Sequence, residues 1–383
     1  MKKYILIILC CLTSFPLWSY NVNMIVEHYS VDQGLPNNTV NCTLKDRDGF
    51  IWFGTWYGLC CFDGVKFKTF NKQEHDSDVP PRKIQRIVED KNGYIWVKTI
   101  DRKLYVFNKV TECFHAVYDD MKNYSENIQV IKLQNTAEGD VLLLTKDKNL
   151  LLAGVDEKGQ VTIKILFDSR NEINKHDYTL KHHVLCETEE YISWIGTDYK
   201  VAAVHKGSEL ASRPADFITS KINSGDKDSF TSFFEDGRKV WVGDRAGIFY
   251  SIDVRTGLVN RYVLSEIKGA ISNLLVTPAG YVYLSVAGQG TYEYDLAERR
   301  LQKINTEMND AMVTHAFIDQ YDKIWFHENE KALIYYDPLN HTAKRFPFTM
   351  FGKITKEGFF SCLRQERPGC STGNMRRWFI SIN

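Results

Sequence analysis

The sequence predicts an all-β protein, because one short module recurs seven times along its 383 residues. Each copy has a tight turn, a short apolar strand, a second turn and another strand. The clearest copy covers residues 46–59 and reads DRDGFIWFGTWYGL. The bulky central residues of successive copies lie 42 to 52 residues apart. A period in the forties that is built from strands and turns is typical of a β-propeller, in which each repeat forms one blade. We therefore expect a seven-bladed β-propeller of four-stranded antiparallel blades.

Each copy has a bulky residue in the middle of its apolar strand, which we call the blade anchor. The anchors are Trp52, Trp96, Leu142, Trp194, Trp241, Tyr283 and Trp325. The fourth copy lacks the turn glycine and has one additional residue before its tryptophan. A tryptophan that fills the space between two blades buries roughly 150–250 Å². We interpret the anchors as packing groups between adjacent blades.

The turn before the anchor strand begins with Asp and ends with Gly in the clearest copies, as at Asp46 and Gly49. Asp accepts backbone hydrogen bonds and Gly tolerates the exit conformation, so this pattern suits a type I turn. The run that follows, residues 51–53, is apolar at every position. A strand has this pattern when both faces of its sheet are covered. Blades that are stacked between two neighbours meet this condition.

A third strand is expected after each second turn. The candidate third strands cover residues 59–62, 104–107, 247–250, 291–294 and 332–336, and blade one has an edge strand at 66–70. The outermost strand of blade seven has two candidates. Either residues 25–29 supply it from the N-terminal end, which joins the two ends of the ring, or residues 344–348 complete the blade locally.

The first twenty residues have the pattern of a secretory signal peptide. Lys2 and Lys3 precede an apolar stretch, residues 4–12, and a small residue follows at Ser19. The apolar stretch is short of the roughly 20 residues that span a bilayer. We expect cleavage near Ser19 or Tyr20, a periplasmic location and no membrane span in the mature chain. The propeller is then expected over residues 21–348, followed by an atypical C-terminal tail over residues 349–383.

Composition and charge exclude several function classes. The chain has 48 basic and 48 acidic residues, and removal of the first twenty leaves 46 against 48. This balance does not favour a nucleic-acid partner or an anionic membrane surface. Seven cysteines remain after residue 20, without a C-x-x-C pair or a metal-ligand spacing. No nucleophile elbow, phosphate-binding loop or zinc-protease motif is present. We expect no catalytic residues, no metal site and no cofactor.

Residues 28–40 read HYSVDQGLPNNTV, and residues 46–55 and 58–64 follow with DRDGFIWFGT and GLCCFDG. These stretches resemble the opening of two-component regulator propellers, which are the periplasmic sensor halves of hybrid two-component systems in polysaccharide-degrading gut bacteria. The resemblance extends over residues 23–348 and is strongest in blades one, two and five. It implies an oligosaccharide ligand released from a glycan.

Family members usually carry two such propellers, an immunoglobulin-like Y-Y-Y domain, a membrane span, a histidine kinase, a receiver and an AraC-type DNA-binding domain. Only 35 residues follow residue 348 in this chain. We therefore expect a sensor that is truncated after its first propeller and that lacks kinase and DNA-binding output. A second propeller or a homodimer partner is a further expectation.

A ligand is expected at the rim that carries the turns between the second and third strands. Aromatic faces stack on sugar rings, and fixed polar groups bind hydroxyls. The candidate ligand-binding residues are Trp56, Tyr57, Asp101, Arg102, Asp198, Tyr199, Asp244, Arg245, Gln289 and Glu328. Ordinary solvated turns would show the same residue types. The alternative function is a free-standing periplasmic scaffold that binds a protein partner through this rim.

Overall fold

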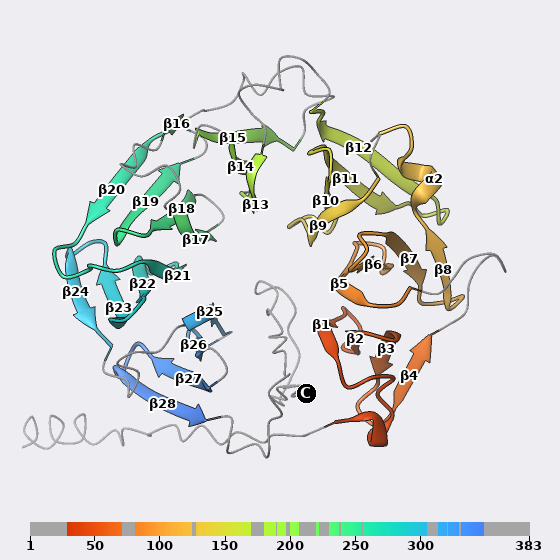
Figure 1. The fold of residues 1–383 in the computed structure, drawn as a ribbon, viewed down its shortest axis with the longest axis horizontal. Coiled ribbons are helices and arrows are strands. Elements are labelled where there is room, and N and C mark those ends of the chain that lie inside the picture. The colour runs from red at the N-terminus through yellow and green to blue at the C-terminus, as the bar shows by residue number, and fades with distance from the viewer. Residues whose placement is uncertain are drawn as a thin grey trace, which may run out of the picture.

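The protein folds into seven four-stranded antiparallel sheets that are arranged in a circle around a central axis (Figure 1). The structure is a computed structural model, and it describes residues 29–70, 81–124, 128–169, 180–188, 190–196, 200–206, 220–221, 230–236, 239–253, 256–304, 313–319, 321–328 and 331–347. The predicted fold class, a seven-bladed β-propeller of four-stranded blades, is confirmed. We call each sheet a blade and number the blades in chain order.

Within each blade the four strands follow one another along the chain, from the inner strand to the outer strand. Blades one to three comprise β1 (Val40–Lys45), β2 (Ile51–Thr55), β3 (Gly58–Phe62), β4 (Phe67–Phe70), β5 (Ile84–Glu89), β6 (Ile95–Thr99), β7 (Leu104–Asn108), β8 (Cys113–Ala116), β9 (Val130–Asn135), β10 (Val141–Thr145), β11 (Leu150–Val155) and β12 (Val161–Phe167). Blades four to seven comprise β13 (Leu180–Glu187), β14 (Tyr191–Gly196), β15 (Lys200–His205), β16 (Ser220–Lys221), β17 (Phe230–Glu235), β18 (Lys239–Asp244), β19 (Ile248–Asp253), β20 (Val259–Val263), β21 (Ile271–Val276), β22 (Tyr281–Val286), β23 (Gly290–Asp295), β24 (Arg300–Lys303), β25 (Val313–Ile318), β26 (Ile324–Glu328), β27 (Ala332–Asp337) and β28 (Thr342–Pro347).

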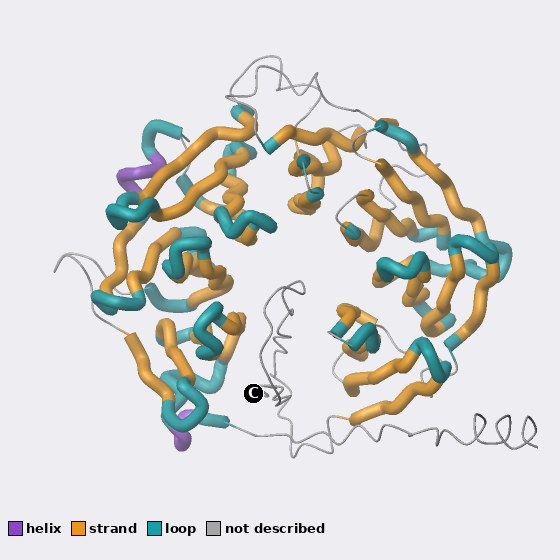
Figure 2. The backbone as a smooth tube through the Cα atoms, turned by 180° about the vertical axis from the view of Figure 1, so that it is seen from behind, coloured by secondary structure: helices purple, strands orange, loops and turns teal. Residues whose placement is uncertain are grey.

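Among the described residues, helical structure is confined to two short elements outside the strands (Figure 2). The 3-10 helix η1 (Val31–Gln33) is capped by Ser30, whose hydroxyl accepts from the Asp32 N–H, and α2 (Tyr118–Met121) follows β8. Neither element, within the described ranges, has the length and apolar character of a membrane span.

The Asp of the repeat does more than shape the turn. Oδ1 of Asp46 accepts from the backbone N–H groups of Asp48 and Phe50, as expected of a turn residue. Its Oδ2 accepts from the indole N–H of the anchor. The same bond recurs in four blades, at Asp46–Trp52 (2.8 Å), Asp90–Trp96 (2.9 Å), Asp236–Trp241 (2.8 Å) and Asp319–Trp325 (3.2 Å). The turn residue therefore satisfies the one polar group that a buried tryptophan brings into the core.

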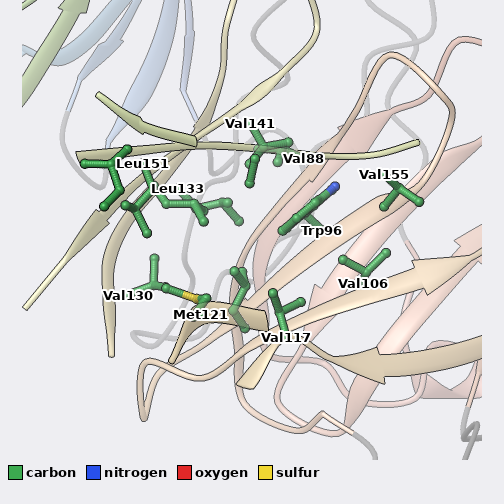
Figure 3. Close-up of a cluster of buried hydrophobic side chains, with 14 residues drawn as sticks. Val88, Trp96, Val106, Val117, Met121, Val130, Leu133, Val141, Leu151 and Val155 are labelled. Atoms are coloured by element: carbon green, nitrogen blue, oxygen red, sulfur yellow. The ribbon is translucent and has the colours of Figure 1, made fainter. Parts of the chain in front are cut away.

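The core consists of apolar layers between adjacent blades. Figure 3 shows the layer between blades two and three, where Trp96 and Val88 of blade two face Leu133, Val141 and Leu151 of blade three. Trp96 is fully buried. A side chain of this size fills the space between two blades and stabilises the contact of both. Each anchor strand has a neighbouring blade on either side, which explains why it is apolar on both faces.

Trp194 departs from the other anchors. It packs with Leu142, Leu144 and Phe167 of the preceding blade, whereas Trp52 and Trp96 pack against the following blade. Strand β14 places Ser193, which pairs with Ala203, at the position that Trp52 occupies opposite Cys61. The additional residue before Trp194 shifts the strand by one, and a shift of one residue moves a side chain to the other face. The alignment of Trp194 with Trp52 is thereby corrected to Ser193.

The outermost strand of blade seven is local. β28 pairs with β27 along Thr342–Pro347, so the sheet is complete without a strand from the N-terminal end. Of the alternative segment, residues 25–29, the structure describes Tyr29 alone, and its ring packs on Phe62 and Phe67 in blade one. Among the described residues, no strand is shared between blade seven and blade one.

Every inner strand has an irregularity that the sequence did not reveal. In all seven blades the pairing of the inner strand with the second strand shifts register close to the start of the inner strand. The extra residue at this bulge links blades in three places. Asn41 donates to the Ile84 carbonyl at 2.7 Å, and Thr231 and Ser272 donate to the first residue of the next inner strand at 2.7 Å and 3.2 Å.

Candidate functional site

The turns between second and third strands form one rim together with the segments that lead into the inner strands. Backbone hydrogen bonds connect these turns from blade to blade. The carbonyl of Trp56 accepts from the N–H of Lys83 at 2.9 Å, and the carbonyl of Lys83 accepts from Ile100 at 2.9 Å. The carbonyl of Arg102 in turn accepts from Val130 at 2.9 Å. The rim of blades one to three is therefore a connected backbone surface on which side chains are held in fixed positions.

Two predicted site residues, Trp56 and Tyr57, lie in the turn between β2 and β3. The Trp56 side chain is 37% exposed and that of Tyr57 is 59% exposed. The ammonium of Lys83 lies 5.1 Å from the centre of the Trp56 ring, which holds the indole by a cation–π contact. The rim of blade one thus presents two aromatic rings to solvent beside a positive charge.

The turn between β6 and β7 carries Asp101 and Arg102, and both side chains are exposed. Asp101 accepts from the Thr99 hydroxyl and forms an ion pair of 3.6 Å with Lys103. Arg102 adopts a left-handed backbone conformation, with φ of 68°. Arg245, in the corresponding turn of blade five, is exposed as well.

Three other predicted residues are engaged within their own blades. Asp244 is buried, and its Oδ1 accepts from the backbone N–H groups of Ala246 and Ile248 at 2.9 Å and 2.8 Å. Gln289 bridges Lys268 and Glu266 through its side-chain amide. Buried Glu328 pairs with Arg345 at 2.9 Å. These side chains stabilise turns and strands, which leaves fewer of their polar atoms for a ligand.

The remaining two predicted residues, Asp198 and Tyr199, lie outside the described residues. The exposed members of the predicted set that the structure describes therefore lie in blades one and two, apart from Arg245.

A layer of side chains that sequence reasoning missed lies just below this rim. Directly after the bulge in six of the blades, a residue of the inner strand pairs with a residue of the second strand. The pairs are Cys42–Gly54, Arg86–Lys98, Lys132–Leu144, Ser232–Gly243, Asn273–Ser285 and His315–His327. The repeats contain the signal, because Lys98 stands where the first and fifth copies have glycine.

An acidic cluster lies at the other end of the strands, where Asp46, Asp48 and Glu89 bring carboxylate oxygens within 4.8 Å of one another. The Lys109 ammonium contacts these carboxylates at 3.1, 3.0 and 2.7 Å. Burial alone would lower the pKa of Lys109, but the hydrogen bonds to Glu89, Asp48 and Asp46 raise it above its ordinary value. The lysine thus occupies the position that a cation would take.

Cys60 and Cys61 belong to two different apolar layers, as expected for neighbours in a strand. Cys42, Cys60 and Cys61 are buried free thiols, and burial raises the pKa of each to about 12. Thiols with a raised pKa carry little thiolate at neutral pH and are unreactive.

Comparison with known proteins gives matches in sequence and in fold. Residues 34–57 match the family model described as two component regulator propeller. A stretch of 84 residues, 20% of this chain and 6% of the relative, is 33% identical to histidine kinase P4 of Formosa agariphila. The chain therefore aligns with only a small part of that kinase.

Solved structures agree on the architecture. The extracellular domain of a hybrid two-component system of B. thetaiotaomicron is similar with a TM-score of 0.50 and 17% identity, over 80% of this chain and 41% of that one. The Dos1 propeller is similar with a TM-score of 0.57 and 13% identity, over 84% and 87% of the two chains. At these identities the likeness concerns the fold. The resemblance to two-component regulator propellers is confirmed by the match at residues 34–57, and this chain is a β-propeller that carries the two-component regulator repeat.

Proposed function

We propose that this chain is the ligand-binding propeller of an exported two-component sensor, and that it recognises an oligosaccharide in polysaccharide utilisation. The observation that carries the proposal is the pair of exposed rings, Trp56 and Tyr57, at the rim of blade one. Both lie inside the stretch that matches the regulator repeat. Exposed aromatic rings beside fixed polar groups favour sugars, because the ring stacks on the apolar face of the sugar while the polar groups bind its hydroxyls.

The proposal places the chain in the periplasm, with residues 1–20 as its export signal. In such a receptor the propeller contributes recognition, and phosphorylation and DNA binding belong to other modules. A second propeller or a second copy of this chain is the expected neighbour of the rim. No turnover is assigned to the chain in this role.

Calorimetric titration and thermal-shift measurements against a panel of oligosaccharides test the proposal. We expect one or more oligosaccharides to bind and to raise the melting temperature, because a ligand that binds the folded state stabilises it. Trp56→Ala and Tyr57→Ala should each weaken this binding by about tenfold, since a lost stacking contact of that size corresponds to about 1.4 kcal/mol.

The control is Phe50→Ala. Phe50 is 41% exposed, similar to Trp56, but it lies in the turn between β1 and β2, at the opposite end of the same blade. Phe50→Ala should leave binding unchanged. Equal affinity of all three variants would remove the blade-one rim from the site. If no oligosaccharide of the panel binds, and a protein partner that contacts the rim is isolated with the chain, the scaffold function is favoured instead.

A further inference from the structure

Lys98 occupies a space that is closed in blades one and five. In blades one and five the same position is glycine, and a Cβ there would lie 2.5 Å from Ile84 and 2.8 Å from Ile271, the first residues of the next inner strands. In blade two the first residue of the next inner strand is the smaller Val130. The cross-strand partners Cys42 and Ser232 would lie even closer to that Cβ, at 2.4 Å each, so blades one and five do not tolerate even a methyl group where blade two accommodates a long side chain.

The Lys98 side chain is 96% buried and yet carries a charge without a counter-ion. Its ammonium donates to the Gln85 side-chain oxygen, which uses one of three N–H donors. Among the described residues no carboxylate lies within ion-pair distance of Lys98. Burial, and then the charge of Arg102, lower the pKa of Lys98 to about 8. Burying an ammonium without an anion costs free energy, so the folded chain is poised to accept a negative charge here.

Two arginines extend this charge to the surface. Arg86 is the cross-strand partner of Lys98 on the inner strand, and Arg102 lies in the rim turn directly after β6. Both side chains are exposed, and neither forms an ion pair within the described part of the chain. The nearest acid on this turn, Asp101, is engaged with Thr99 and Lys103. Guanidinium groups bind carboxylate and sulfate groups through paired hydrogen bonds.

The cations lie next to the aromatic rim of blade one. Lys83 donates its backbone N–H to the Trp56 carbonyl and accepts from Ile100, which precedes Arg102 by two residues. A sugar ring stacked on Trp56 would therefore extend toward blade two. We propose that Lys98, Arg86 and Arg102 form an anion subsite that binds a carboxylate or sulfate group of the oligosaccharide. This inference rests on the proposed function and specifies its ligand as an acidic glycan fragment.

Calorimetry on the full chain tests the subsite with a sulfated heparin hexasaccharide, a trigalacturonate, neutral cellohexaose and inorganic sulfate. We expect at least one acidic oligosaccharide to bind about tenfold or more tighter than cellohexaose, with an affinity that falls as salt rises. The sulfated and carboxylated probes show which anion the subsite takes.

Lys98→Met and Arg86→Gln should each weaken binding of the acidic probe about tenfold while leaving cellohexaose unaffected. The unliganded Lys98→Met variant should melt at the same or a higher temperature, because methionine fills the space without a buried charge. A lysine with a purely structural role would instead lower the melting temperature when replaced. Arg86 is exposed, so Arg86→Gln keeps the test valid if the core variant fails to fold. Lys158→Met, at an exposed turn of blade three, is the matched control and should behave as the wild type.

Two results would overturn the subsite. Unchanged affinity of Lys98→Met and Arg86→Gln for the acidic probe would do so, and so would a preference for cellohexaose. In the second case the chain still binds a glycan, so the proposed function stands and only the anion subsite fails. If none of the four probes binds, the result counts against both the proposed function and the anion subsite.

Discussion

Blades two and six solve the same packing problem with different chemistry. In blade two the anchor is Trp96, and its indole N–H is satisfied by Asp90 in the preceding turn. In blade six the anchor is Tyr283, and its hydroxyl donates at 2.8 Å to Glu293 on the neighbouring strand. Glu293 also accepts from Tyr336 of blade seven at 3.1 Å. Burial, and then Glu293, raise the pKa of Tyr283, so the phenol remains a donor.

This difference teaches that the turn residue and the anchor are a matched pair. The turn residue is Asp in the four blades with an indole at the anchor position. It is Thr in the other three, at Thr136, Thr188 and Thr277, where the anchor position holds leucine, serine and tyrosine. A threonine hydroxyl accepts from the turn backbone but offers no second oxygen for an indole. Blade six is therefore not an eroded copy, since Glu293 provides the hydrogen bond that Tyr283 requires, and in blade three the leucine anchor requires none.

The largest effect should come from removing an anchor. Trp96→Ala leaves a cavity between blades two and three and should lower the free energy of unfolding by about 3–5 kcal/mol. Urea unfolding measures this loss. Trp56→Ala, which removes the same side chain from an exposed position, should change stability little. Equal losses in the two variants would show that the layer in Figure 3 does not support the fold.

Removing the turn carboxylate that accepts from the anchor indole should have the next largest effect on stability. Asp90→Ala deprives the Trp96 indole and the backbone N–H groups of Asn92, Tyr94 and Val155 of their acceptor. We expect a loss of about 2–3 kcal/mol, because buried donors without an acceptor are costly. In a Trp96→Phe background the same change should cost less, since phenylalanine has no N–H. A double-mutant cycle that gives no coupling energy between positions 90 and 96 would contradict the match between turn residue and anchor.

Loss of the anchor hydrogen bond in blade six should cost less stability than the loss of the turn carboxylate in blade two. Tyr283→Phe removes one of the two hydroxyls that donate to buried Glu293 and should cost about 1.5 kcal/mol. Tyr57→Phe, at an exposed ring, should be neutral by the same urea measurement. A neutral Tyr283→Phe would mean that Tyr336 alone satisfies the carboxylate.

The last effect is a pH dependence, and it concerns the charge in blade two. The pKa of Lys98 is about 8 in the folded chain, below its ordinary value of 10.5, so between these pH values the unfolded chain binds more protons. The free energy of unfolding of the wild type should therefore rise relative to Lys98→Met as pH increases from about 8 to 10.5. Parallel stability curves for the two proteins across this window would contradict a buried lysine with a lowered pKa.

The sequence predicted the fold, and the points at which the structure differs from the expectation have physical causes. Trp194 was aligned with Trp52 because each is followed by an apolar residue and then Gly-Thr, but strand register assigns faces, and one additional residue reverses them. Asp244 and Glu328 were expected among the ligand residues because they were assigned to the turns between second and third strands. The structure buries both and engages Asp244 with turn N–H groups and Glu328 with Arg345.

The amino-acid sequence by itself determined the number of blades, the turns and the apolar anchor strands, because a repeat of local propensity and burial pattern is visible in one dimension. Only the tertiary structure decided which blade faces an anchor, which side chain satisfies each buried polar group, and that buried Lys98 is paired across the strands with Arg86 and feels the charge of Arg102. These outcomes depend on contacts between residues that belong to different strands and blades, and pairwise contacts of that kind leave no periodic pattern along the chain.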